Sequence, residues 1–218
     1  MIAVVYLFIL VSIIIYYVTK PTPNKKQNYR VAKAGDVDHI SPLAKELNDL
    51  SNKTFYFNGE NVNINDYEVF VVDGESMSNC GIHTDNGVLV SRLFDKQKID
   101  NGTIVIYEID STRYAYTHPN AVEPQSGFKI RQFLGYADLS NNNQEIYESV
   151  KNIDVDLNDM EFKNLLFSKL DKARNYFHNQ MVTISITYKD ETKDYSIHSL
   201  SELYGIVRYI IPKSYLKN

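Results

Sequence analysis

The chain has 218 residues, of which 44% are hydrophobic and 23% charged, and its formal net charge is −4. This composition is that of a folding protein rather than a disordered one, and the length suffices for one ordinary core with an appendage. The slight negative charge argues against direct nucleic-acid binding, which usually needs a basic surface. The single cysteine, Cys80, excludes an intramolecular disulfide, which fits a reducing compartment.

The first segment predicts a transmembrane anchor. Residues 2–18 read IAVVYLFILVSIIIYYV, an uncharged and almost wholly apolar run. At about 1.5 Å per residue, a helix of this length is at the short end of what spans a hydrocarbon core of about 30 Å. A cleavable signal peptide would begin with basic residues and end in a small-x-small site, whereas this run opens uncharged and leads into Thr19-Lys20-Pro21. We therefore assign residues 1–19 to a single-pass anchor.

The flanking charges predict the orientation of this anchor. No Lys or Arg precedes the apolar run, whereas five follow it closely: Lys20, Lys25, Lys26, Arg30 and Lys33. Basic residues favour the cytoplasmic side of a membrane, so the C-terminal part is expected in the cytoplasm.

A basic linker and a short helix are expected over residues 20–53. Residues 20–36 are polar, basic and proline-containing, as is typical of an exposed linker. Ser41-Pro42 then opens a short helical pattern with leucines on one face at positions 43, 47 and 50.

From residue 54 to the C-terminus the pattern is mainly β, with turn signals at Asn58-Gly59 and Asn101-Gly102. Strands are predicted over 67–72, 87–90, 103–109, 128–134, 182–188 and 205–211, with one more after a turn at 189–192. Apolar residues at helical spacing over 162–177 predict one helix. In the strand over 182–188, alternation of apolar residues with Thr and Ser predicts burial of one face.

The chemistry is concentrated in residues 69–92, VFVVDGESMSNCGIHTDNGVLVSR. A strand ends in Asp73-Gly74, and Ser76 follows at once. A serine on a sharp turn after a strand exposes both a nucleophilic hydroxyl and backbone N–H groups that can stabilise an oxyanion. By itself a serine in a turn is ordinary turn chemistry.

The longer pattern resembles the LexA/UmuD family of self-cleaving serine/lysine peptidases and, more distantly, the type I signal peptidases. The family's Gly-x-Ser-Met, its Gly-Ile pair and its Leu/Val-rich strand are matched without a gap by Gly74, Ser76, Met77, Gly81, Ile82, Leu89 and Val90. Thr84-Asp85-Asn86 departs from the family's Asp-Gly-Asp turn. The resemblance covers about residues 66–135 well and the last twenty loosely, and it implies that the stretch of about 136–180, which holds the predicted helix, is an insertion.

The resemblance implies a LexA-like peptidase domain of the β-clip type over residues 54–218. It also implies that Ser76 is the nucleophile of a Ser/Lys dyad, with the N–H groups of Glu75 and Ser76 holding the oxyanion. A homodimer would be in keeping with such a family.

The general base is expected on the strand around residues 128–133. Strict alignment with the family puts Arg131 at the lysine position, but arginine keeps its proton and cannot act as a base. Lys129 lies two residues earlier on the same strand face, roughly 6.6 Å away. A lysine buried beside the serine loses its proton more easily, so we assign the role to Lys129. A lysine on a strand is more often an exposed solvating residue, and a dead enzyme is the rival hypothesis.

The linker contains a candidate cleavage site. Val31-Ala32-Lys33-Ala34-Gly35 is similar to the Val-Ala-Ala-Gly at which LexA cuts itself, and Ala34 lies 42 positions before Ser76. Self-cleavage between Ala34 and Gly35 would release residues 35–218 from the membrane. The expected partners are thus the membrane and the protein's own linker or another polypeptide as substrate.

Two alternatives remain. A signal-peptidase-like enzyme acting on exported chains would need the domain outside the cytoplasm, against the Lys/Arg distribution. The second alternative is a non-catalytic module for oligomerisation or binding, and the presence of Arg131 at the lysine position is the main observation in its favour. No cofactor or metal is expected, because the five histidines show no metal-binding spacing and the chain has no Gly-rich phosphate loop.

Overall fold

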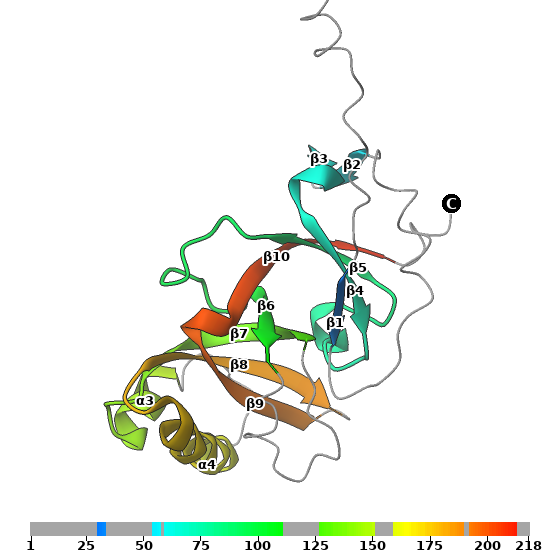
Figure 1. The fold of residues 1–218 in the computed structure, drawn as a ribbon. Coiled ribbons are helices and arrows are strands. Elements are labelled where there is room, and N and C mark those ends of the chain that lie inside the picture. The colour runs from blue at the N-terminus through cyan, green and yellow to red at the C-terminus, as the bar shows by residue number, and fades with distance from the viewer. Residues whose placement is uncertain are drawn as a thin grey trace, which may run out of the picture.

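The computed structural model describes residues 30–33, 54–57, 59–110, 127–150, 159–189 and 192–212. This described part is mainly β, as the sequence predicts, with an eight-stranded sheet, a separate two-stranded hairpin and two α-helices (Figure 1). Short 3-10 helices lie at Ile64–Asp66, Ser78–Cys80 and Leu200–Glu202.

Six strands of the large sheet close on themselves. In order around the ring they are β1 (Arg30–Lys33), β4 (Glu68–Asp73), β5 (Gly87–Ser91), β10 (Leu203–Ile211), β6 (Ile104–Ile109) and β7 (Gly127–Asp138). β1 pairs in parallel with β4 on one side and with β7 on the other, and all other neighbours in the ring are antiparallel. The ring is therefore a small barrel, and β1 is the strand that closes it between β4 and β7.

The position of β1 corrects the prediction of an exposed linker over residues 20–36. Four residues of that stretch, Arg30–Lys33, form a strand inside the sheet instead. Backbone pairing explains the difference, because β4 and β7 would otherwise each present an unpaired strand edge, and β1 satisfies both.

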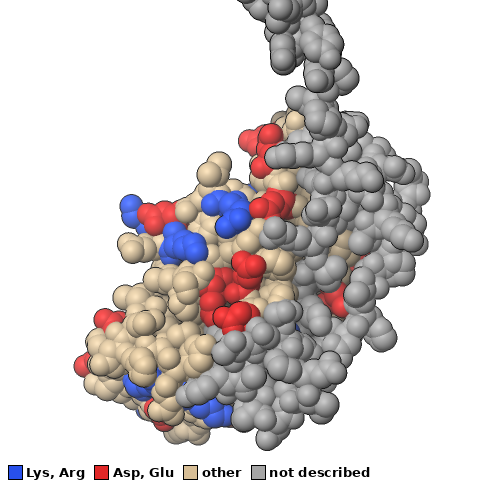
Figure 2. Space-filling view, in the orientation of Figure 1, with Lys and Arg blue, Asp and Glu red and all other residues tan. Residues whose placement is uncertain are grey.

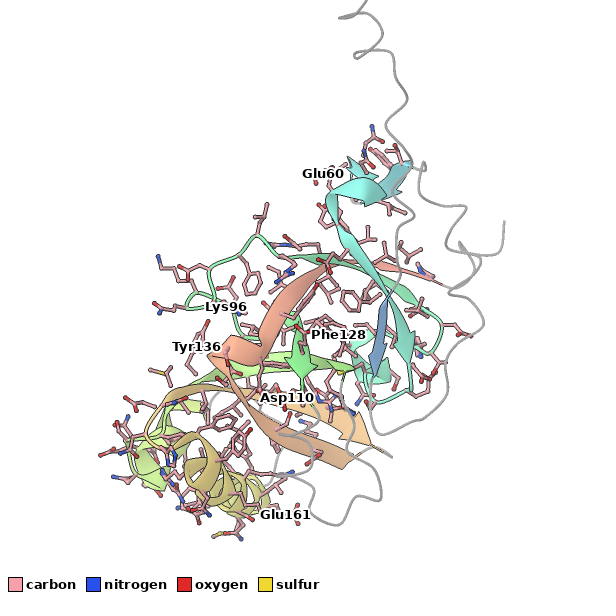
Figure 3. All side chains as sticks on the ribbon, viewed as in Figure 1. Glu60, Lys96, Asp110, Phe128, Tyr136 and Glu161 are labelled. Atoms are coloured by element: carbon pink, nitrogen blue, oxygen red, sulfur yellow. The ribbon has the colours of Figure 1, made fainter. Side chains whose placement is uncertain are left out.

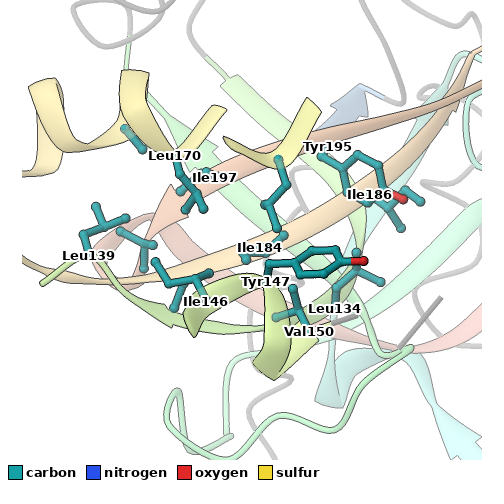
Figure 4. Packing of buried hydrophobic residues seen from close by; sticks show 14 of the residues in the cluster. Leu134, Leu139, Ile146, Tyr147, Val150, Leu170, Ile184, Ile186, Tyr195 and Ile197 are labelled. Carbon is teal, nitrogen blue, oxygen red and sulfur yellow. The ribbon is translucent and has the colours of Figure 1, made fainter. Parts of the chain in front are cut away.

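The same sheet continues beyond the barrel through two more strands. β7 extends past the ring to pair with β8 (Met181–Lys189), which pairs in turn with β9 (Thr192–Ser199). Helices α3 (Asn143–Val150) and α4 (Asp159–Phe177) pack against this extension through a common apolar cluster (Figure 4). The predicted helix is α4. Helix α3 was not predicted, so the stretch of about 136–180 holds two helices rather than one.

The hairpin of β2 (Thr54–Phe57) and β3 (Glu60–Asn63) forms a sheet of its own (Figure 1), and Val62 of β3 packs in one buried cluster with Val69 and Leu89 of the barrel strands. Its turn includes Gly59, whose φ of +89° lies in the left-handed region that glycine adopts without strain.

The barrel has its own apolar core. Its buried members are Phe70, Val72, Met77, Ile82, Val88, Val90, Ile106, Ile130 and Tyr204. Phe128, at the start of β7 (Figure 3), packs its ring edge-on against Phe70 and Tyr204, with centroids 5.0 and 4.9 Å apart. These aromatic contacts fix the beginning of β7 within the barrel, close to where β1 joins it.

Several predictions concern residues outside the described part. The anchor over residues 1–19, the short helix after Ser41-Pro42 and the Ala34-Gly35 dipeptide all lie there. Within the described ranges, no helix combines the length and the apolar character needed to cross a membrane.

Candidate functional site

Ser76 lies in the turn that follows β4. The strand ends at Asp73, and Gly74 adopts a φ of +99°, a conformation that side-chain-bearing residues rarely reach. A short 3-10 helix begins at Ser78, whose N–H donates to the Glu75 carbonyl at 2.9 Å. The chain thus turns sharply on both sides of Ser76.

The Ser76 hydroxyl is buried without a hydrogen bond. Its Oγ is shielded from solvent and has no hydrogen-bond partner in the described part of the chain. Leaving a buried hydroxyl unsatisfied costs about 1–3 kcal/mol, so such groups are rare and concentrate at functional sites. The burial corrects the expectation that the turn exposes this hydroxyl. Within the described part the hydroxyl also lacks the bond to the nearby backbone that a turn serine usually makes.

Strand β8 holds the backbone of Ser76 from the other side. The Ser76 carbonyl accepts hydrogen bonds from the Tyr188 N–H at 2.7 Å and from the Thr187 hydroxyl at 3.1 Å. Thr187 and Tyr188 were not predicted as site residues, because local sequence gives no sign of a contact across more than a hundred residues.

The N–H groups of Glu75 and Ser76 are those expected to hold the oxyanion. Within the described ranges, no hydrogen bond engages the N–H of Glu75 or of Ser76. The Glu75 side chain instead braces the turn by accepting from the Thr84 N–H and pairing with His83 Nδ1, both at 2.9 Å. Partial burial alone would raise the pKa of Glu75, but these hydrogen bonds together lower that pKa below its ordinary value.

The turn Thr84-Asp85-Asn86, which leads into β5, contains a residue in the left-handed region. Asp85 adopts a φ of +69°. Asp tolerates this left-handed conformation better than most residues. The turn is closed by the Asp85 N–H donating to the Val72 carbonyl at 2.9 Å and by the Asn86 side chain accepting from the His83 N–H at 2.8 Å.

Lys129 and Arg131 are both buried on one face of β7. Lys129 is 6% exposed and Arg131 8%, so neither is the solvating surface residue that a strand lysine usually is. Lys129 pairs with Tyr107 across the β6–β7 ladder, and Arg131 pairs with Val105. Arg131 Nη1 donates to the Ile130 carbonyl at 2.7 Å.

Buried polar residues continue across β8 on the side that holds Ser76. Thr183 and Ser185 are fully buried and Thr187 is 5% exposed, although the alternating sequence predicted burial of only one face of this strand. The prediction was wrong because internal partners replace water. Tyr107 bonds Thr183 through its hydroxyl at 2.9 Å, and burial raises the pKa of Tyr107 to about 12.

The register of β7 and β8 relates this polar row to the basic residues. Gln132 of β7 pairs with Ile186 of β8. Continuing the antiparallel register by one residue places Arg131 opposite Thr187. Thr187 is the residue whose hydroxyl donates to the Ser76 carbonyl. The turn bearing Ser76 therefore lies beside the strand that carries Arg131 and Lys129.

Strand β1 lies between the two halves of this site. Lys33 pairs with Asp73 at the end of β4 and with Lys129 on β7. Because neighbouring strands are about 4.8 Å apart, the backbones at Asp73 and Lys129 stand about 10 Å apart with β1 between them. Ala34 and Gly35 follow directly after Lys33 and lie outside the described residues.

The remaining polar groups of the described part show no further reactive cluster. No three His, Cys, Asp or Glu side chains in the described ranges could hold a metal ion together. Cys80 is half-buried, its thiol lies 3.7 Å from the Gln132 side-chain oxygen, and burial raises its pKa. Figure 2 shows basic and acidic side chains close together on the visible described face.

We compared the chain with family models, with curated proteins and with solved structures, and none of them matches it.

Proposed function

We propose that this protein is a serine/lysine peptidase of LexA-like type that is anchored to the cytoplasmic face of a membrane and cuts its own chain between Ala34 and Gly35. Ser76 is the nucleophile and Lys129 the general base. We also propose that the mainly β part of the chain is a LexA-like domain of the β-clip type.

The observation that carries the proposal is the position of β1. This strand runs parallel to the strand that leads to Ser76 and parallel to the strand that carries Lys129. It ends at Lys33, and successive Cα atoms are about 3.8 Å apart, so Ala34 begins one residue beyond the level of Asp73 and Lys129. A substrate strand bound between a nucleophile and a base would need this arrangement.

The Ser76 hydroxyl has no hydrogen-bond partner among the described residues, which supports the same chemistry. In the first step Ser76 Oγ attacks the carbonyl carbon of Ala34, and its proton passes to neutral Lys129 Nζ. The N–H groups of Glu75 and Ser76 would hold the oxyanion. Protonated Lys129 then returns the proton to the Gly35 nitrogen, and the C–N bond breaks.

The second half of the reaction restores the enzyme. The first step leaves an ester between Ala34 and Ser76 Oγ. Water attacks this ester, with Lys129 again taking the proton; Lys129 then gives this proton to Ser76 Oγ as the ester C–O bond breaks, which restores the hydroxyl and the neutral lysine. Holding substrate and nucleophile in one chain gives a high effective concentration, so a weak site can still be cut.

The test is to incubate the purified full-length protein in detergent at pH 7 to 10 and to sequence any new N-terminus. We expect a fragment that begins at Gly35, that forms faster as the pH rises, and that is absent from Ser76→Ala and Lys129→Met. The rate should rise with pH because only the neutral lysine acts as a base.

The non-catalytic alternative makes the opposite prediction. An intact wild-type chain over this pH range, with the same folded spectrum as Ser76→Ala, would contradict self-cleavage. A fragment that persists in Ser76→Ala would identify a contaminating protease.

A further inference from the structure

We propose that the loop after β5, residues 92–98, docks on an anionic phospholipid surface: Leu93 enters the membrane interface, and the basic residues beside it lie against lipid phosphates. This inference rests on one part of the proposed function, the membrane anchor, and is independent of peptide cleavage. The folded domain then makes a membrane contact of its own, in addition to the anchor.

Leu93 is the most exposed large apolar residue of the described part. It is 90% exposed, so almost its whole side chain lies in water. Single exposed apolar residues are common on protein surfaces, so exposure alone assigns no role to Leu93. Its support, its charged neighbours and its position in the fold are what point to lipid.

The structure holds this loop in place around Leu93. The next residue, Phe94, packs with Ile99 and Tyr136 against a buried apolar cluster. The Tyr136 hydroxyl donates to the Lys96 carbonyl at 2.9 Å and accepts from the Ile99 N–H at 2.8 Å. Because the residues after it are fixed to the body of the protein, Leu93 is presented to the surroundings by a supported loop.

The loop is basic although the chain as a whole is acidic. Residues 92–98 contain Arg92, Lys96 and Lys98 but one acidic residue, Asp95, whereas the net charge of the chain is −4. Blue side chains gather at the upper left of Figure 2, the side on which the loop lies in Figure 1. Clusters of basic residues near a membrane are attracted to anionic lipids.

These cations keep room for a lipid phosphate. The side chains of Arg92 and Lys98 are 56% and 82% exposed, and their nearest carboxylates, on Glu68 and Asp95, lie 3.8 Å away. Exposed ion pairs of this kind are weak. Partial burial and, after it, the Arg92 charge lower the pKa of Lys96, so the two cations repel each other, and an anion between them would relieve this repulsion.

The topology places the loop at the end of the barrel that is nearest the anchor. β1 runs parallel to β4, so the chain that leads from residues 1–19 reaches the barrel at the end where β4 begins. β5 is antiparallel to β4 and pairs Val90 with Glu68, the first residue of β4. The loop after β5 therefore starts at this same end, whereas Ser76 follows the opposite end of β4.

The length of the linker keeps this end close to the membrane. Ten residues, 20–29, separate the expected anchor from β1. At no more than about 3.5 Å per residue, they reach at most about 35 Å. A second exposed apolar side chain, Tyr56 at 73%, belongs to the hairpin that leads into the start of β4. Tyrosine is a residue that membrane interfaces favour.

The chain contains no tryptophan, so Leu93→Trp gives fluorescence from a single site. The full-length variant also carries Ser76→Ala to keep the chain intact. It is reconstituted into vesicles of phosphatidylcholine and phosphatidylglycerol, with or without lipids brominated in their acyl chains. Met160→Trp in the same background is the control, because Met160 is 63% exposed and precedes Glu161, which Figure 3 places at the opposite end of the molecule from Glu60 of the hairpin.

We expect brominated lipids to quench Leu93→Trp at least about twofold, because interfacial side chains enter about 5–10 Å into the boundary between headgroups and acyl chains. Met160→Trp should stay unquenched. Quenching of Leu93→Trp should weaken in phosphatidylcholine alone and when Lys96→Gln and Lys98→Gln are added. Equal quenching in neutral and anionic vesicles would contradict the role of the basic residues.

Flotation of the vesicles reports separately on the anchor. Protein that floats with the vesicles but is equally unquenched at both positions would overturn the inference and leave the proposed function standing. Protein that does not float would overturn the anchor and the docking of the loop together. A blue-shifted Leu93→Trp emission that bromine does not quench would show that protein, such as a second copy of the chain, covers the leucine, which would also overturn the inference.

Discussion

At the scale of single residues, the backbone of Ser76 is fixed by Thr187 as well as by its own turn. Thr187→Val keeps the shape of the side chain and removes its 3.1 Å hydrogen bond to the Ser76 carbonyl. We expect self-cleavage to fall by about tenfold, because small misplacements of reacting groups are costly, and stability to fall by about 1 kcal/mol.

Thr183→Val is the matched control for this change. It removes a buried hydroxyl from the same strand, one that bonds Tyr107 and the His198 carbonyl rather than Ser76. This control should lose stability but keep the wild-type cleavage rate in the same gel assay. Equal rates in the two variants would show that Thr187 has no part in positioning the nucleophile.

Cys80 is a second residue with a predicted behaviour, and it lies four positions after Ser76, the proposed nucleophile. Burial raises the pKa of its thiol, so little thiolate forms near neutral pH. Because it is the chain's single cysteine, alkylation by iodoacetamide reports on one site. At pH 7.5 we expect labelling of the folded protein to be at least about tenfold slower than of the urea-unfolded protein. Equal rates would mean that the thiol is not protected.

At the scale of strands, the contact between β10 and β5 depends on Gly205. A Cβ at this position would lie 2.5 Å from Val90 Cγ1 and 3.0 Å from the Ser91 carbonyl oxygen. Gly205→Ala should therefore lower the free energy of unfolding by about 1–3 kcal/mol in urea titrations. Gly87→Ala, whose Cβ would meet Ile211 at an ordinary 3.4 Å, is the control and should cost clearly less.

Most strands were predictable because they carry runs of β-branched and aromatic residues bounded by turn signals. β1 was not, because Arg-Val-Ala-Lys has no such run, and its strand conformation depends on two distant edges that it joins. Helix α3 was missed because its predominantly polar sequence, NQEIYESV, offers only a short apolar stripe.

In the candidate site too, features set by neighbouring residues could be predicted, whereas features set by distant residues could not. Ser76 on a glycine turn was readable from neighbouring residues. The burial of Thr187 was not, because alternation shows that the two faces of a strand differ and does not reveal what covers the polar one. Its bond to Ser76 joins residues 111 positions apart, and only the assembled sheet brings them together.

At the scale of the whole molecule, closure of the barrel and presentation of the proposed substrate depend on one strand. Ala32 on β1 pairs with both Val72 and Phe128. Ala32→Pro removes a backbone donor in the middle of this strand, so we expect cleavage to fall at least about tenfold while the circular dichroism of the β domain is retained. Gln27→Pro, just before β1, should cleave at the wild-type rate. Equal cleavage in both variants would contradict a role for β1 in presenting the bond.

The proposed cut falls after β1, so the closing strand would belong to the severed N-terminal piece. Hydrolysis would turn a continuous chain into a nicked two-chain complex that is still joined by the hydrogen bonds of Arg30–Lys33 to β4 and β7. Scission and departure from the membrane are then separate events, and strand dissociation sets the pace of the second. We expect the 35–218 fragment to appear on denaturing gels before it appears in the supernatant of sedimented vesicles. Low urea should shorten that delay by loosening the strand, whereas simultaneous appearance would mean that β1 leaves as soon as it is cut.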